Sequence, residues 1–144
     1  MGKTLVVYYS FSGMSKVMAE QYAKKTSEPV LEIKDKKKPS AAKAYTSGVF
    51  FSVKGKAWPI QPIETDLKKY SSFVLFFPIW AGNAPPSVNA FFELLPENKS
   101  VSIKALSSIG HSKCRDRIEA VLKQKKCSLD GYTDIKTGGK AENF

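Results

Sequence analysis

Two loops of this 144-residue sequence contain residue types that suit an anionic or an aromatic ligand. The first loop, residues 10–15 (SFSGMS), follows an apolar run and leads into helix-forming residues. Hydroxyl groups, a glycine and the N-terminal N–H groups of a helix together suit a phosphate group. The loop has neither the Gly-x-Gly-x-x-Gly pattern nor the Gly-Lys-Ser/Thr ending of a P-loop, so it does not favour NAD or ATP. Alone it favours phosphate only mildly, because Ser12 could simply cap a helix.

The second loop, residues 78–86 (PIWAGNAPP), follows the most apolar run of the chain. A tryptophan that leaves a buried strand offers a flat face for an aromatic ligand, and Ala81-Gly82 lets the backbone approach the ligand edge. The competing interpretation is a core tryptophan followed by a turn glycine. Taken alone, this second interpretation is the more common case.

Strand and helix patterns alternate along the chain and place both loops. Apolar runs rich in β-branched and aromatic residues predict strands at Lys3–Tyr9, Val30–Ile33, Ser72–Ile79 and Ser100–Ile109, with a final strand within Leu129–Ile135. Helices are predicted between them from apolar stripes: Met14, Val17, Met18 and Tyr22; Val88, Phe91, Phe92 and Leu95 after Pro85-Pro86; and Cys114, Ile118, Val121 and Leu122. Residues 41–45 suggest a further helix, which Gly48 and Gly55 should limit.

This alternation predicts one domain over residues 1–144, with a parallel sheet and helices on both of its faces. Ligands of such sheets settle beyond the carboxyl ends of the strands, where the strand order reverses. The loops after the first, third and fourth strands should therefore form the site.

The two loops together resemble the flavodoxin-like family, in particular its flavodoxin-type quinone reductase and small flavoprotein branches. The resemblance extends from Lys3 to about Val121. It implies a three-layer fold with a doubly wound five-stranded parallel sheet of order 2-1-3-4-5 and FMN as the cofactor. It also implies phosphate contacts from Ser10, Ser12, Gly13, Met14 and Ser15, and ring contacts from Pro78, Trp80, Ala81, Gly82 and Asn83. The third loop, with Ser107, Ser108, Ile109, Gly110 and His111, would approach the pyrimidine side of the flavin.

Two features depart from the family pattern. The family closes with a helix after the fifth strand, which is missing from the pattern of residues 137–144, so we expect an open apolar face that self-associates, that another segment covers, or that marks a truncated member. Electron-carrying flavodoxins are usually acidic, whereas the 23 Lys and Arg residues here outnumber 13 Asp and Glu residues, giving a net charge of +10. Since positive charge stabilises an anionic reduced flavin, we expect a less negative reduction potential than in an acidic flavodoxin.

These patterns lead us to expect a cytoplasmic FMN-binding electron carrier or small oxidoreductase. Its partners would be a redox protein or a small acceptor such as a quinone, with NAD(P)H as a candidate donor and a homodimer as one option. The alternative is a flavodoxin-fold interaction module without cofactor.

His111 would either assist proton transfer or, more commonly for a loop histidine, be solvated. We expect no specific nucleic-acid binding, no membrane span and a solvated Lys34–Lys38 run. Tyr45, Phe50, Phe51 and Trp58 either line a substrate entrance or pack under a long loop.

Overall fold

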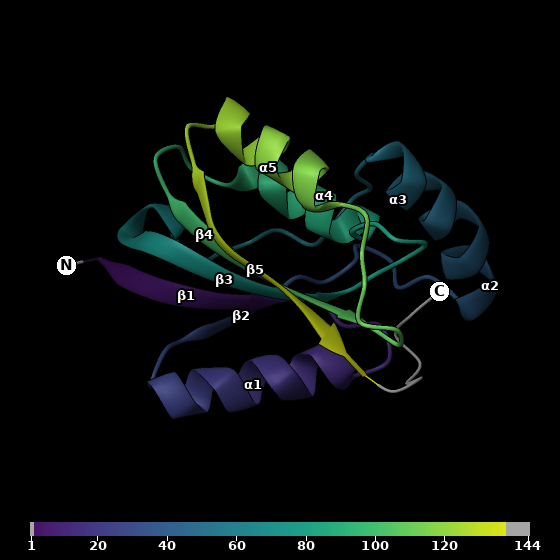
Figure 1. Cartoon of the computed structure of the whole chain (residues 1–144), viewed down its shortest axis with the longest axis horizontal. Coiled ribbons are helices and arrows are strands. Elements are labelled where there is room, and N and C mark those ends of the chain that lie inside the picture. The colour runs from purple at the N-terminus through teal and green to yellow at the C-terminus, as the bar shows by residue number, and fades with distance from the viewer. Residues whose placement is uncertain (1, 138–144) are drawn as a thin grey trace.

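Five parallel strands form one sheet in the computed structural model, which describes residues 2–137 (Figure 1). The strands are β1 (Lys3–Tyr8), β2 (Val30–Glu32), β3 (Tyr70–Pro78), β4 (Ser100–Ser107) and β5 (Ser128–Lys136). They pair in the order β2-β1-β3-β4-β5, which confirms the predicted α/β fold. Because β1 pairs with both β2 and β3, the strand order reverses next to β1, and the loop after β1 opens at that point.

Helices cover both faces of the sheet. They are α1 (Met14–Thr26), α4 (Pro86–Leu94) and α5 (Arg115–Gln124), with α1 on one face and the other two on the opposite face (Figure 1). A short 3-10 helix, η2 (Leu67–Lys69), precedes β3. Within residues 2–137, no helix combines the length and the apolar character that crossing a bilayer requires.

The helix predicted near residue 41 runs further than expected. It comprises α2 (Ala41–Lys43), the π-helical segment η1 (Ala44–Gly48) and α3 (Val49–Lys54). Gly48 adopts ordinary helical angles, with φ −62°, and the left-handed Gly55 ends the helix at φ 69°. A glycine inside a helix costs only about 1 kcal/mol, and Gly48 is itself buried next to the rings of Trp58 and Trp80, so the helix continues through it.

The inner face of α1 differs from the predicted stripe. Its buried residues are Ser15, Ala19 and Ala23, and Met14, Met18 and Tyr22 pack beside them, whereas Val17 is 49% exposed. Three small residues spaced four apart form a row that lets the helix approach the sheet closely. Val17, two positions away from Ser15, therefore points away from the sheet.

The α1 face of the sheet is polar where α1 does not cover it. Side chains alternate along β4, and Val101, Ile103 and Ala105 belong to the core on the α4 side, so Ser102 and Lys104 face the α1 side. They pair with Gly131 and Thr133 of β5. The same side also carries Leu106 and Ile135, which pack in the cluster under α1, so the described part of this face is partly polar and the open apolar face stays a prediction. The predicted lack of a closing helix concerns residues 138–144, which lie outside the described residues.

Candidate functional site

The first loop turns into α1 through a left-handed glycine. Gly13 is the N-cap of α1 with φ 113°, a conformation that glycine adopts far more readily than other residues. Its backbone N–H donates to Ser10 Oγ over 2.9 Å. The cap residue thus has no side chain, and the interpretation of Ser12 as the helix cap is wrong.

The start of α1 has the character of an anion site. No acidic residue occupies its first turn, and apart from Gly13 itself and its two chain neighbours no side chain of the described residues lies within 4 Å of the place where a side chain on Gly13 would begin. The 13-residue helix directs its positive dipole end at this space. Ser12 is exposed, and Ser15 is buried in the first turn. This donor set fits a phosphate group.

The second loop forms a tight two-residue turn. Trp80 and Asn83 exchange backbone hydrogen bonds of 2.8 and 3.0 Å across Ala81 (φ 50°) and Gly82 (φ 84°), as in a type I′ turn. A left-handed alanine stores about 1 kcal/mol of strain. The Asn83 side chain donates to Ala81 O over 3.0 Å and accepts from Arg117 over 3.3 Å. Its own side-chain contacts therefore hold the turn in shape.

The Trp80 indole is buried in the core. Its exposed fraction is 0%, and edge-to-face contacts surround it, with ring centroids 6.0 Å from Tyr9, 5.9 Å from Phe11 and 6.2 Å from Trp58. The expectation that this ring leaves the strand as an exposed stacking face is therefore wrong. The physical reason is that aromatic residues from two other segments, residues 9–11 and Trp58, close over it. Pro78, the last residue of β3, is likewise buried.

The third loop lies against the second. Ser107 Oγ accepts from the backbone N–H of His111 over 3.0 Å and donates to its carbonyl over 3.2 Å, and Gly110 turns the chain at φ 74°. His111 is exposed, and Ser108 is half-buried. Lys113 N–H donates to Gly82 O over 2.6 Å, which joins this loop to the second. Since Phe11 contacts Trp80, the three predicted loops meet at one edge of the sheet.

A hydrogen-bonded cluster that the sequence did not reveal supports this edge. Asp35 accepts from Tyr9 Oη over 2.7 Å, from Trp58 Nε1 over 3.0 Å, and from the Ser87 hydroxyl. Trp58 Nε1 also lies 2.7 Å from Ser87 Oγ. No local pattern signals the cluster, because its members come from four separate segments. Lys113 and Arg117 also escaped prediction, since a basic residue is unremarkable in a chain with 23 of them.

Cys114, next to the third loop, has no features of a catalytic thiolate. Burial raises the pKa of its thiol, and its Sγ lies 3.3 Å from Tyr132 Oη. Burial also raises the pKa of Tyr132 above its usual range. Both groups therefore keep their protons at neutral pH. Tyr132 Oη also lies 2.5 Å from Ser112 Oγ, which donates to Asp134 over 2.6 Å, so the thiol lies at the end of a hydrogen-bonded chain that contains no general base next to it.

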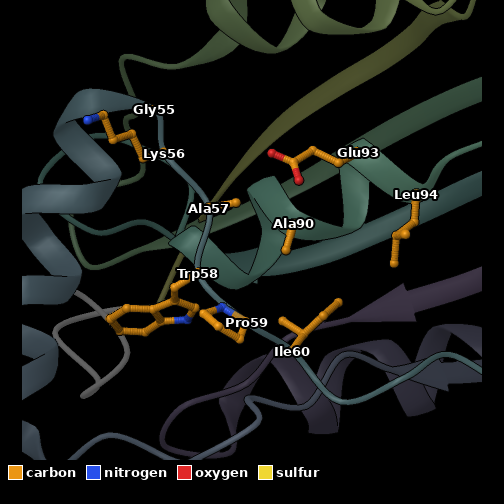
Figure 2. A pocket seen from close by; sticks show the side chains of 9 residues that line it. All are labelled: Gly55, Lys56, Ala57, Trp58, Pro59, Ile60, Ala90, Glu93 and Leu94. Carbon is orange, nitrogen blue, oxygen red and sulfur yellow. The ribbon is translucent and has the colours of Figure 1, made fainter.

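One cavity touches the first loop, and a larger one lies outside the three loops. A cavity of 240 Å³ touches Tyr9 and Ser10 of the first loop and is bordered by Lys34, Lys36 and Lys38. A larger one of 730 Å³ lies between residues 55–60 and α4; in Figure 2 the side chains of Ala90, Glu93 and Leu94 border it from the helix. None of its lining residues belongs to the three loops. Glu32 and Asp35 also line the small cavity, so the charge next to the first loop is mixed, with three lysines against two carboxylates.

Comparisons with known proteins agree with this geometry. Residues 3–131 match the family described as Flavodoxin. A protein from Bacteroides uniformis ATCC 8492 has a similar structure, with 24% identity, a TM-score of 0.77, and coverage of 95% of this chain and 93% of the other. A flavoprotein from Lactobacillus acidophilus NCFM, solved in complex with FMN, has 21% identity, a TM-score of 0.75 and coverage of 92% of both chains. The comparison with curated protein sequences gave no match.

Proposed function

Because the chain belongs to the flavodoxin family, we propose that it binds FMN at the three loops and acts in electron transfer or as a small oxidoreductase. The observation that carries the proposal is the placement of the start of α1, which has a glycine N-cap and no acidic residue in its first turn, beside the rigid turn of residues 80–83. The first feature suits the phosphate, and the second offers backbone to the edge of a flat ring. The FMN complex of the Lactobacillus acidophilus flavoprotein supports the choice of cofactor.

The three loops would bind different parts of FMN. Ser10, Ser12, Gly13, Met14 and Ser15 would hold the phosphate, while Ala81, Gly82 and Asn83 on one side and Ser108, Gly110 and His111 on the other would border the ring. Because Trp80 is buried, the second loop would present to the flavin ring its backbone and the half-buried residues 81–83. When bound, FMN supplies the redox chemistry, and the chain supplies binding and electrostatics.

The phosphate interaction gives the proposal its sharpest test. Isothermal titration of the purified protein with FMN and with riboflavin should show FMN binding at least about 30-fold more tightly, since charge-assisted hydrogen bonds to a dianion contribute roughly 2 kcal/mol or more. Gly13→Val, which strains the left-handed N-cap, should weaken FMN far more than riboflavin. Gly131→Ala, at a position without positive φ, is the matched control. Equal affinities for FMN and riboflavin would refute phosphate binding by α1.

The electron acceptor requires a separate assay. We propose a redox protein or a quinone as the acceptor, and the basic surface supports an acidic protein. The FMN-loaded protein is mixed with NADH or NADPH and a quinone, and oxidation of the nicotinamide is followed by absorbance. Turnover indicates a reductase, and its absence together with rapid reoxidation of the reduced flavoprotein by an acidic redox protein indicates a carrier. An additional His111→Gln variant tests proton transfer by that side chain.

A cofactor-free interaction module is the second candidate, and the full burial of Trp80 favours it. In this case the aromatic residues around the indole serve only as core. The visible absorption spectrum separates the two candidates, because bound oxidised flavin is yellow. A colourless protein that does not bind added FMN would establish the second candidate.

A further inference from the structure

A third cavity, of 390 Å³, combines aromatic walls with a cationic rim. Phe51 and Trp58 line it together with two prolines and Ser47, and Lys36, Lys37 and Lys43 complete the lining. Its volume lies in the range of small-molecule sites, roughly 300–1,000 Å³. None of its lining residues belongs to the three loops assigned to FMN. It is therefore distinct from the three loops, although it shares Lys36 with the 240 Å³ cavity beside Ser10.

The aromatic wall of this cavity is fixed in place. Trp58 Nε1 is hydrogen-bonded to Asp35 over 3.0 Å and to the fully buried Ser87 over 2.7 Å, so the indole cannot rotate freely. The Phe51 ring lies 5.9 Å from the indole, with the two planes inclined at 48°. A ligand ring therefore meets a surface that needs no ordering on binding, which lowers the entropic cost.

No ion pair offsets the positive charge of the rim within the described residues, and the nearby carboxylate of Asp35 is hydrogen-bonded to Trp58. No acidic side chain lines the cavity, and within residues 2–137 none of the three lysines forms an ion pair. The ion pair in this part of the chain joins Lys34 to Glu32 over 3.9 Å, and neither residue lines the cavity. Three like charges around one opening repel one another, and an anion bound between them removes this repulsion.

We propose that this cavity binds a small aromatic anion, with its ring against Phe51 and Trp58 and its acidic group among the three lysines. An aromatic carboxylate and an adenine nucleotide share this chemistry. The site goes beyond the proposed flavin function and does not depend on it. Trp58 also contacts Trp80, so the ligand would lie one ring away from the second loop.

The test titrates the protein, loaded with FMN to the extent that it binds, with four probes: naphthoate, AMP, neutral naphthalenemethanol and inorganic phosphate. NMR follows the indole N–H signals of Trp58 and Trp80, which a Trp58→Phe variant assigns, and calorimetry gives the affinities. We expect naphthoate or AMP to shift the Trp58 signal and to bind at least about tenfold more tightly than naphthalenemethanol and phosphate. The tighter of the two ligands identifies the source, an aromatic acid or a nucleotide.

Single lysine variants test the rim. Lys37→Gln and Lys43→Gln should each weaken binding by about two- to fivefold, and Lys24→Gln, on the exposed side of α1, should leave it unchanged. Equal binding of the neutral analogue, an unmoved Trp58 signal, or indifference to the rim lysines would overturn the proposal. So would release of FMN by the probe, because the probe would then occupy the flavin site. A protein that binds no flavin at all still reports through the Trp58 signal, so the two proposals fail separately.

Discussion

Replacing Gly48 by alanine should disturb the second loop through Trp80. A Cβ at residue 48 would lie 2.5 Å from Trp80 Cζ3, 3.1 Å from Cε3 and 3.2 Å from Trp58 Cη2. Real Cβ atoms essentially never show contacts under 3.0 Å, so one of the groups must move. The Trp80 ring is fully buried among Tyr9, Phe11 and Trp58 and has little room to do so.

Two opposing effects set the magnitude. Overpacking a well-packed core costs about 1–3 kcal/mol, whereas alanine is favoured over glycine inside a helix by about 1 kcal/mol. Gly48 has helical angles, so the substitution receives the full helix gain. These two effects leave a net loss of about 0–2 kcal/mol, and because the 2.5 Å contact is with a fully buried ring, we expect Gly48→Ala to lower the free energy of unfolding by an amount near the upper end of this range. Because Trp80 closes the turn of residues 80–83, FMN affinity should fall as well.

Urea unfolding measures the first effect and calorimetric FMN titration the second. Gly131→Ala is the control: its Cβ would lie 3.4 Å from Ser102 Oγ, an ordinary contact, so the stability should change by less than about 0.5 kcal/mol. In a Trp80→Phe background the smaller ring removes the close atom, and Gly48→Ala should become neutral or stabilising. An equal loss in both backgrounds, or no loss in the parent protein, would refute this reasoning.

Three further predictions concern the surroundings of the site. Asp35→Ala removes the acceptor of three hydrogen bonds and should lower the free energy of unfolding in urea by about 2–3 kcal/mol, whereas Asp35→Asn keeps one acceptor oxygen and should lose less; equal losses would contradict the role of the carboxylate. Burial, with the charge of Glu32, raises the pKa of Tyr8 from 10.0 to about 12, so the unfolded chain loses this proton first and stability should fall as pH rises from 10.0 to about 12. Tyr8→Phe should flatten this part of the stability curve, and an unchanged slope argues against the shift. Lys113 extends its side-chain stem over Gly82, and Lys113→Gln should therefore lower the flavin reduction potential by tens of millivolts in a redox titration, unlike Lys123→Gln at the far end of α5; an equal change in both variants would show that only net charge matters.

Local patterns in the sequence were sufficient to predict the sheet and the edge that carries the site. Strand runs and helical stripes repeat over a few residues, and parallel connections of this length have one favoured hand, so the order of elements implies the three-layer architecture. The loops after β1, β3 and β4 then meet for geometric reasons alone. The same reasoning failed for Val17, because the row of small residues that fits α1 to the sheet is a property of the interface.

Only the tertiary structure decided what each side chain of the site does. Trp80 is a core residue because Tyr9, Phe11 and Trp58, which lie between 22 and 71 positions away in the sequence, pack around it. Asp35 gathers donors from three distant segments, and Gly48 is required by an indole 32 positions later. Hydrophobic periodicity records which face of an element is buried, but burial and close contact between distant segments depend on how the elements pack, which no local pattern contains.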